Sequence, residues 1–292
     1  MKIPWKRTNF RGREVTLLGG ALLVGQLVTG HAINALRGDS ISWRIAAASL
    51  GAGLVGGYDD MTDSETRNKT TKGLHGHLGA LAEGRLSPGA VKMLGLIATG
   101  MLAAKPRRQV LDWLVEAGVI AGGANLVNLF DLRPGRALKV ASLVGLAGIF
   151  PRCACGGRGQ SPKMGRQDRA LVNLFAIGAA FPMDVREYTM LGDMGANSLG
   201  AALAATWIPG RSRGAKLAVL AGITALTLAS EKISFSAVIE NHPLMKTLDE
   251  LGRHRDDQSE KNRNPAPAVT DEMVPSIPFQ TNDAVAVKET PA

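Results

Sequence analysis

Long apolar runs fill most of this 292-residue chain before residue 253, and short polar stretches separate them. The clearest run, residues 15–36, has no formal charge, and at about 1.5 Å per residue it can cross a hydrocarbon core of about 30 Å. Further apolar segments lie at 41–58, 89–104, 109–130, 137–150, 170–183, 195–208 and 214–230. We interpret Lys92, Lys139 and Lys216 as flanking residues that snorkel to a membrane surface. The pattern therefore predicts an all-α, polytopic transmembrane helical bundle of about eight spans.

Composition supports a membrane domain followed by a tail. Apolar residues make up 45% of the chain, aromatic residues only 4%, and 35 residues are glycine, a mixture that suits closely packed small-residue helices. From residue 253 onward the chain is polar, contains five of the 14 prolines and has no hydrophobic period. Such a segment cannot bury enough apolar surface to fold alone. We predict a transmembrane domain over residues 1–253 and a disordered cytoplasmic tail over residues 254–292.

The charge balance indicates phosphate-bearing partners. Residues 253–292 carry 5 Lys or Arg and 7 Asp or Glu, which leaves 29 and 18 for residues 1–252, a net charge of +11. This suits anionic lipid head groups and nucleotide phosphates. Nucleic acid is not expected, because no zinc-finger, RNA-recognition or helix-turn-helix pattern accompanies the charge. The chain also has no Walker loop, HExxH or nucleophile elbow, which excludes the ATPase, zinc-protease and hydrolase classes that depend on them.

Four polar, glycine-flanked stretches carry the candidate chemistry: NFRGRE at 9–14, GGYDDMTD at 56–63, NLVNLFDLRPGR at 125–136 and LGDMGANSLG at 191–200. Three of them place aspartate beside an apolar segment, and a carboxylate at the edge of hydrocarbon is costly enough to suggest a functional site. Alternating eight spans puts all four stretches and both termini on one membrane face. The basic amino terminus indicates that this face is cytoplasmic. Carboxylates that converge there would form a site for Mg²⁺ and phosphate.

Five short motifs follow one another along the chain in the order seen in a known family. The motifs are N-x-R-G at Asn9, Arg11 and Gly12; D-D at Asp59 and Asp60; K-G-x-x-G-H at Lys72, Gly73, Gly76 and His77; N-x-x-N-L-x-D at Asn125, Asn128 and Asp131; and G-D-x-G at Gly192, Asp193 and Gly195. Over residues 8 to 253 the chain is similar to glycosyltransferase family 4, the polyprenyl-phosphate sugar-1-phosphate transferases. The resemblance implies a multi-pass protein of the bacterial cytoplasmic membrane, with its active face cytoplasmic.

The resemblance also implies a reaction and roles for residues. A lipid phosphate attacks the β-phosphorus of a UDP-sugar, of the N-acetylhexosamine type, and UMP leaves; the products feed peptidoglycan and other cell-envelope polymers. Asp193 is the expected ligand of Mg²⁺, for which Mn²⁺ is the alternative. Asp59 or Asp60 would orient or deprotonate the lipid phosphate.

The resemblance implies that further residues bind substrate. The expected substrate-binding residues are Asn125, Asn128, Asp131, Lys72, His77, Arg11, Gly192 and Gly195. The glycines are included because they let the backbone approach phosphate closely.

The family's D-G-x-D-G run reads D-L-R-P-G here, with Leu132 and Pro134 at the changed positions and the cations Arg133 and Arg136 added. The His-rich loop near the carboxyl end is also missing. The sequence is compatible with a homo-oligomer.

Other interpretations of the same residues stay open. The protein could be a catalytically silent membrane scaffold or regulator on the same fold. The DDMTD stretch at 59–63 also satisfies D-D-x-x-D of intramembrane prenyltransferases, although the second aspartate-rich motif expected there is missing. The Asp-Asp pair could instead cap a helix, and Asp193 could close a turn. Asn125 and Asn128 have i, i+3 spacing, so they could bond neighbouring helices.

Overall fold

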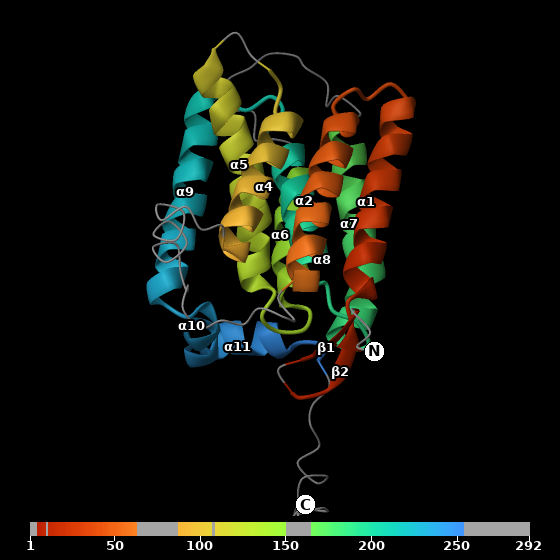
Figure 1. Cartoon of the computed structure of the whole chain (residues 1–292), viewed down its shortest axis with the longest axis vertical. Coiled ribbons are helices and arrows are strands. Elements are labelled where there is room, and N and C mark those ends of the chain that lie inside the picture. The colour runs from red at the N-terminus through yellow and green to blue at the C-terminus, as the bar shows by residue number, and fades with distance from the viewer. Residues whose placement is uncertain (1–4, 10, 63–86, 107–108, 150–164, 254–292) are drawn as a thin grey trace, which may run out of the picture. The chain divides into compact units, whose positions relative to one another are not determined.

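The computed structural model describes residues 5–9, 11–62, 87–106, 109–149 and 165–253. These residues belong to the first of two units of the chain, Met1–His254; the second is Arg255–Ala292. They form ten helices and one short hairpin, which confirms the all-α class (Figure 1). The predicted tail, together with Lys72 and His77, lies outside the described residues.

Eight helices correspond to the eight predicted apolar segments. They are α1 (Leu18–Leu36), α2 (Ser42–Thr62), α4 (Pro88–Ala103), α5 (Val110–Phe130), α6 (Arg136–Ile149), α7 (Gly165–Val185), α8 (Gly192–Trp207) and α9 (Arg213–Lys232). Local signals explain several of the helix starts: the hydroxyls of Ser87 and Ser212 accept backbone N–H bonds at the amino ends of α4 and α9, both at 3.2 Å. The main difference from the prediction is α7, which begins in the charged segment at Gly165.

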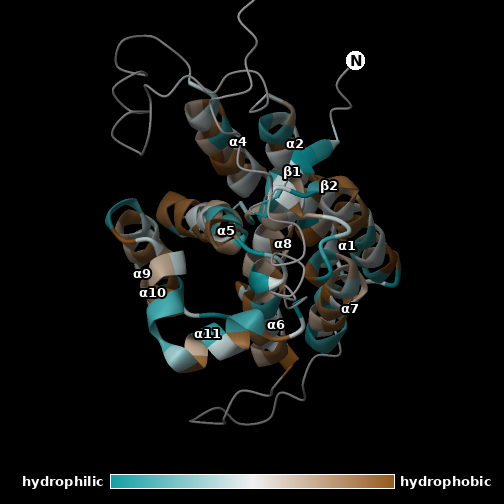
Figure 2. Cartoon of the chain, turned by 90° about the horizontal axis from the view of Figure 1, so that it is seen from below, coloured by the Kyte–Doolittle hydropathy of each residue, from teal (hydrophilic) through white to brown (hydrophobic). Residues whose placement is uncertain are grey.

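Helix α8 lies at the centre of the bundle and is surrounded by α1, α2, α5, α6 and α7 (Figure 2). Glycines permit its close approach to two neighbours. A Cβ at Gly56 of α2 would overlap the backbone carbonyl of Asp193, and one at Gly200 of α8 would overlap the carbonyl of Gly123 in α5. The small-residue composition is therefore used to bring backbones together around α8.

One end of the bundle carries the polar elements. Strands β1 (Lys6–Thr8) and β2 (Glu14–Thr16) form an antiparallel hairpin in which Arg7 lies opposite Val15. An isolated bridge between Thr16 and Thr189 ties the hairpin to the loop before α8. Two short helices, α10 (Phe235–Asn241) and α11 (Pro243–Glu250), lie across the same end (Figure 1).

Two of the described helices, α5 and α9, are long and apolar enough to cross a membrane. Membrane crossing by any of the eight helices stays a prediction. The interpretation of Lys92 and Lys216 as snorkelling residues is wrong, because both ammonium groups are held in ion pairs with carboxylates of the bundle. The Lys216 side chain is buried, 2.6 Å from Glu116, and that of Lys92 is partly buried. Lys139 likewise donates to the Asp249 carbonyl at 2.5 Å. Facing acidic or carbonyl oxygens supply these ammonium groups with partners that the sequence pattern does not reveal.

Candidate functional site

The amino end of α8 is surrounded by carboxylates from other elements. Four consecutive backbone N–H groups there, from Leu191 to Met194, cannot find partners within the helix. The Asp60 carboxylate, on the last turn of α2, accepts from Asp193 N at 3.2 Å and Met194 N at 2.9 Å. The Gly192 N–H donates to Asp131. Asp184 accepts from the Leu191 N–H. The end of α8 is therefore fixed by three carboxylates from α2, α7 and the α5–α6 loop.

Asp60 has a structural role in this arrangement. Its side chain is only 6% exposed, and its oxygens are directed at the α8 backbone, where negative charge is favoured by the helix dipole. The guanidinium of Arg7 lies 3.6 Å from Asp60 Oδ1 and also donates to the Asp60 carbonyl at 2.9 Å. Gly192 has a φ of 59°, and a Cβ there would lie 2.8 Å from Asp60 Oδ2. Glycine at 192 is thus required for Asp60 to reach α8.

Asp59, Lys92, Asn128 and Asp193 form the second group, which we name the shared-lysine cluster. The Lys92 ammonium lies 3.0 Å from Asp59 Oδ2 and also forms an ion pair with Asp193. The two carboxylates are within hydrogen-bonding reach of each other, and the Asn128 side chain bonds to Asp193. All three charged side chains keep part of their surface open to solvent. With both carboxylates ionised, the one shared ammonium leaves one unit of negative charge, which a further cation can balance.

Asp131 lies in the turn after α5, next to these carboxylates. Burial raises the pKa of Asp131 well above its usual value, and the negative charges of Asp184, Asp193 and Asp60 raise it further. Asp184 accepts a hydrogen bond from the Gly135 N–H at 2.6 Å, which fixes the other end of the same loop. Sequence reasoning missed Asp184, because it follows an apolar segment without flanking glycines.

The predicted N-x-R-G stretch is fastened to the loop before α8. Asn9 Nδ2 donates to Glu187 Oε2 at 2.7 Å, and Arg11 Nη1 lies 3.1 Å from Glu187 Oε1. Asn9 Oδ1 in turn accepts the backbone N–H groups of Arg11 and Arg13, both at 2.9 Å. Asn9 therefore organises the turn of the hairpin. A substrate contact for Arg11 stays a prediction.

The cations that depart from the family pattern bind the carboxyl-terminal helices. Arg136 makes a buried two-point contact with Asp249 of α11, Nε to Oδ1 at 2.8 Å and Nη2 to Oδ2 at 2.7 Å. Arg133 lies 3.1 Å from Glu240 of α10. Burial opposes ionisation of Asp249, but the Arg136 hydrogen bonds and the charges of Arg253 and Arg136 outweigh burial and hold the pKa of Asp249 below its usual value. The D-L-R-P-G loop is thus an anchor for α10 and α11.

Two further residues predicted to bind substrate, Gly195 and Asn125, lie near this end of the bundle. Gly195 packs on α1, where its Cβ would lie 2.7 Å from Gly20 Cα, so its small size serves helix packing. Asn125 lies on α5 one turn before Asn128 and is half-buried. The structure therefore brings Asp59, Asp60, Asp131 and Asp193 together at one end.

The fit of a metal ion depends on the donor atoms. In the described part of the chain, no three His, Cys, Asp or Glu side chains are arranged to hold one. The Asp59–Asp193 pair nevertheless offers two oxygen donors. Mg²⁺ is commonly held by one or two carboxylates while phosphate and water complete its shell. The residues fit this open mode of binding.

Comparison with known proteins identifies no relative: no protein-family model, curated protein or solved structure matches the chain. The interpretation of the site therefore depends on its geometry and on the motifs.

Proposed function

We propose that the protein is a membrane phosphoglycosyltransferase that moves a sugar-1-phosphate from a UDP-sugar to polyprenyl phosphate in cell-envelope polymer synthesis. The observation that supports this most is the shared-lysine cluster. It combines two carboxylates, an ammonium and an amide from four helices at one end of the bundle. These groups suit a reaction between two phosphate-bearing partners, in which positioning and charge neutralisation account for most of the catalysis.

In the proposed step, an oxygen of the lipid phosphate forms a bond to the β-phosphorus of the UDP-sugar. The bond from that phosphorus to the oxygen bridging the α-phosphorus breaks, and UMP leaves with the bridging oxygen. Asp193, oriented by Asn128, and Asp59 would hold Mg²⁺, which supplies positive charge at the diphosphate. Lys92 would bind the β-phosphate as a point charge once the two carboxylates no longer share it. Because Asp60 is committed to α8, we assign the contact with the lipid phosphate to Asp59.

The distribution of apolar side chains supports a multi-pass membrane location. Large apolar side chains are exposed on the outer faces of several helices, among them Leu22, Leu54, Leu102, Leu143 and Phe175. Polar residues such as His31, Asn173 and Asn197 are instead fully buried. A bundle with apolar residues outside and polar residues inside is typical of membrane proteins. The cytoplasmic membrane of a bacterium, with the cluster on the cytoplasmic face, is the location we propose.

A donor screen tests the proposal. Protein purified in detergent is mixed with undecaprenyl or decaprenyl phosphate, Mg²⁺ and a panel of radiolabelled UDP-sugars, and UMP release is measured. We expect release with at least one N-acetylhexosamine donor, and its loss in Asp193→Asn while the variant stays folded. An active family member run in parallel checks the lipid and the donors. No release with any donor beside an active control would contradict the proposal.

The second candidate is a silent scaffold on the same fold. It is favoured by the internal use of charged groups: Asp60 caps α8, Lys92 pairs with two carboxylates, and Arg133 and Arg136 bind α10 and α11. A scaffold predicts that no donor releases UMP and that no nucleotide stabilises the protein against heat. The two candidates therefore differ in both binding and turnover.

A further inference from the structure

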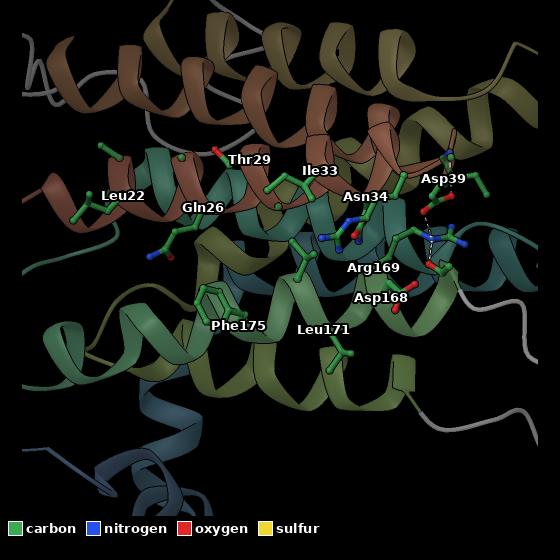
Figure 3. A pocket seen from close by; sticks show the side chains of 18 residues that line it. Leu22, Gln26, Thr29, Ile33, Asn34, Asp39, Asp168, Arg169, Leu171 and Phe175 are labelled. Carbon is green, nitrogen blue, oxygen red and sulfur yellow. Dashed lines mark hydrogen bonds and ion pairs between the residues drawn. The ribbon is translucent and has the colours of Figure 1, made fainter.

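A long groove runs between α1 and α7, separate from the shared-lysine cluster. Its volume is about 1200 Å³, above the roughly 300–1000 Å³ of pockets for drug-sized ligands. Its lining extends along α1 from Ala21 to Arg37, which at 1.5 Å per residue is about 24 Å. Figure 3 shows side chains from both helices along it: Leu22, Thr29, Ile33 and Asn34 from α1, and Leu171 and Phe175 from α7. The length exceeds the roughly 15 Å of one leaflet's hydrocarbon, so an acyl chain fits along it.

The charged groups of the groove gather at the end remote from the cluster, where α1 ends and α7 begins, whereas Gln26 and Thr29 lie farther along α1. Arg169 and Asp39 are paired there at 3.1 Å (Figure 3). The exposed side chains of Arg37 and Asp168 also line this end, and neither has an ion pair among the described residues. One turn deeper along α1, Asn34 Nδ2 is buried and has no hydrogen-bond partner in the described part of the chain. This end therefore presents one cation, one anion and one amide donor to the groove.

We propose that the groove binds a phospholipid with a zwitterionic amine head group, in the leaflet opposite the shared-lysine cluster. The lipid phosphate pairs with Arg37, and its ammonium pairs with Asp168. An ester carbonyl of the lipid, which lies just below the head group, accepts from Asn34 Nδ2. The acyl chain then runs past Ile33 and Phe175. The proposal depends on the membrane location and does not depend on transferase activity.

Two glycines supply a matched test of the groove. Gly25 lines the groove, and a Cβ added there meets no heavy atom within 4 Å, so a larger side chain at this position begins in open space. Gly178 of α7 is equally open, but it is not among the lining residues. Gly25→Leu therefore fills the groove, and Gly178→Leu adds the same bulk elsewhere on the helix surface.

The experiment is native mass spectrometry of the full chain in detergent with equal amounts of phosphatidylethanolamine and phosphatidylglycerol. The wild-type protein should retain one phospholipid and prefer phosphatidylethanolamine. Gly25→Leu should weaken retention about tenfold, the loss expected when about two methylene groups are no longer buried. Gly178→Leu should retain lipid as the wild type does. Asp168→Asn should keep lipid binding but lose the preference for the amine head group.

Three results would overturn the proposal. The first is equal retention by Gly25→Leu and wild type at unchanged helicity and melting temperature. The second is equal loss from both leucine variants, which would show lipid bound without a specific site. The third is a dimer that Gly25→Leu converts to a monomer without loss of lipid. Ala21, Gly25 and Thr29 form a small-residue stripe on α1, so that result would assign the groove to a second helix.

Discussion

The two adjacent aspartates of α2 should respond differently to the same substitution. In Asp60→Asn the amide can accept one of the two α8 N–H bonds, but its NH₂ group must face the other. Losing a hydrogen bond to a charged acceptor, with a buried N–H left unsatisfied, costs about 2–3 kcal/mol. For a domain of this size, each kcal/mol lost from the free energy of unfolding lowers the melting temperature by about 2–4 °C. Asp60→Asn should therefore lower the melting temperature by about 4–12 °C.

Asp59→Asn is the matched control. Asp59 accepts no hydrogen bond from the α8 backbone, and Lys92 keeps Asp193 as a partner when the Asp59 charge is removed. A partly exposed ion pair contributes about 0–1 kcal/mol, so the melting temperature should change by less than about 4 °C. Turnover should nevertheless fall, because Asp59 is the group that we place at the lipid phosphate.

The assay is thermal unfolding in detergent, followed by tryptophan fluorescence. Helicity at 20 °C, measured by circular dichroism, checks that both variants fold. Equal destabilisation by the two substitutions would refute the assignment of separate roles. So would an Asp60→Asn variant as stable as the wild type.

Three further predictions concern the same end of the bundle. Gly192→Ala should lower stability by about 1–3 kcal/mol in the same assay, because alanine is strained at positive φ and its Cβ would press on Asp60; unchanged stability would contradict the close approach. Lys92→Gln should strengthen Mg²⁺ binding without nucleotide, because two carboxylates lose their shared cation, and a larger Mg²⁺-induced rise in melting temperature would show it. Asp249→Asn should destabilise the docking of α11 by about 3–5 kcal/mol, since the buried Arg136 keeps its hydrogen bond to Ser236 but loses its carboxylate partner, and faster proteolysis of α10 and α11 would report it. Because the pKa of Asp249 is lowered on folding, this contribution is full above the unfolded value of about 3.9 and is lost as pH falls through the folded value, so variant and wild type should converge in acid.

The helices could be predicted from the sequence because apolar segments and capping residues are local signals. The expected apolar segment 214–230 occurs within α9, and the expected segment 41–58 differs from α2 by one residue at its start and four at its end. The paired arrangement of α10 and α11 across one end could not be predicted. It depends on contacts such as Arg136 with Asp249, which are separated by 113 residues.

The candidate site was predictable in position but not in detail. Glycine-flanked aspartates beside apolar segments indicated that Asp59, Asp60, Asp131 and Asp193 lie at one end, as the structure shows. Which aspartate caps α8 depends on the direction of two neighbouring side chains at the end of α2, and the sequence does not encode that direction locally. Lys92 looked like a flanking residue, and only the fold brings it between Asp59 and Asp193.

Binding of Mn²⁺ in the presence of UDP, followed by electron paramagnetic resonance, tests most directly whether this end of the bundle is a metal–diphosphate site. Free Mn²⁺ should fall when wild-type protein and UDP are both present, and it should stay high with Asp193→Asn. Asp168→Asn, at the opposite end, should behave as the wild type. A wild-type protein that takes up no Mn²⁺ with UDP, or an Asp193→Asn variant that takes up as much, would contradict the account.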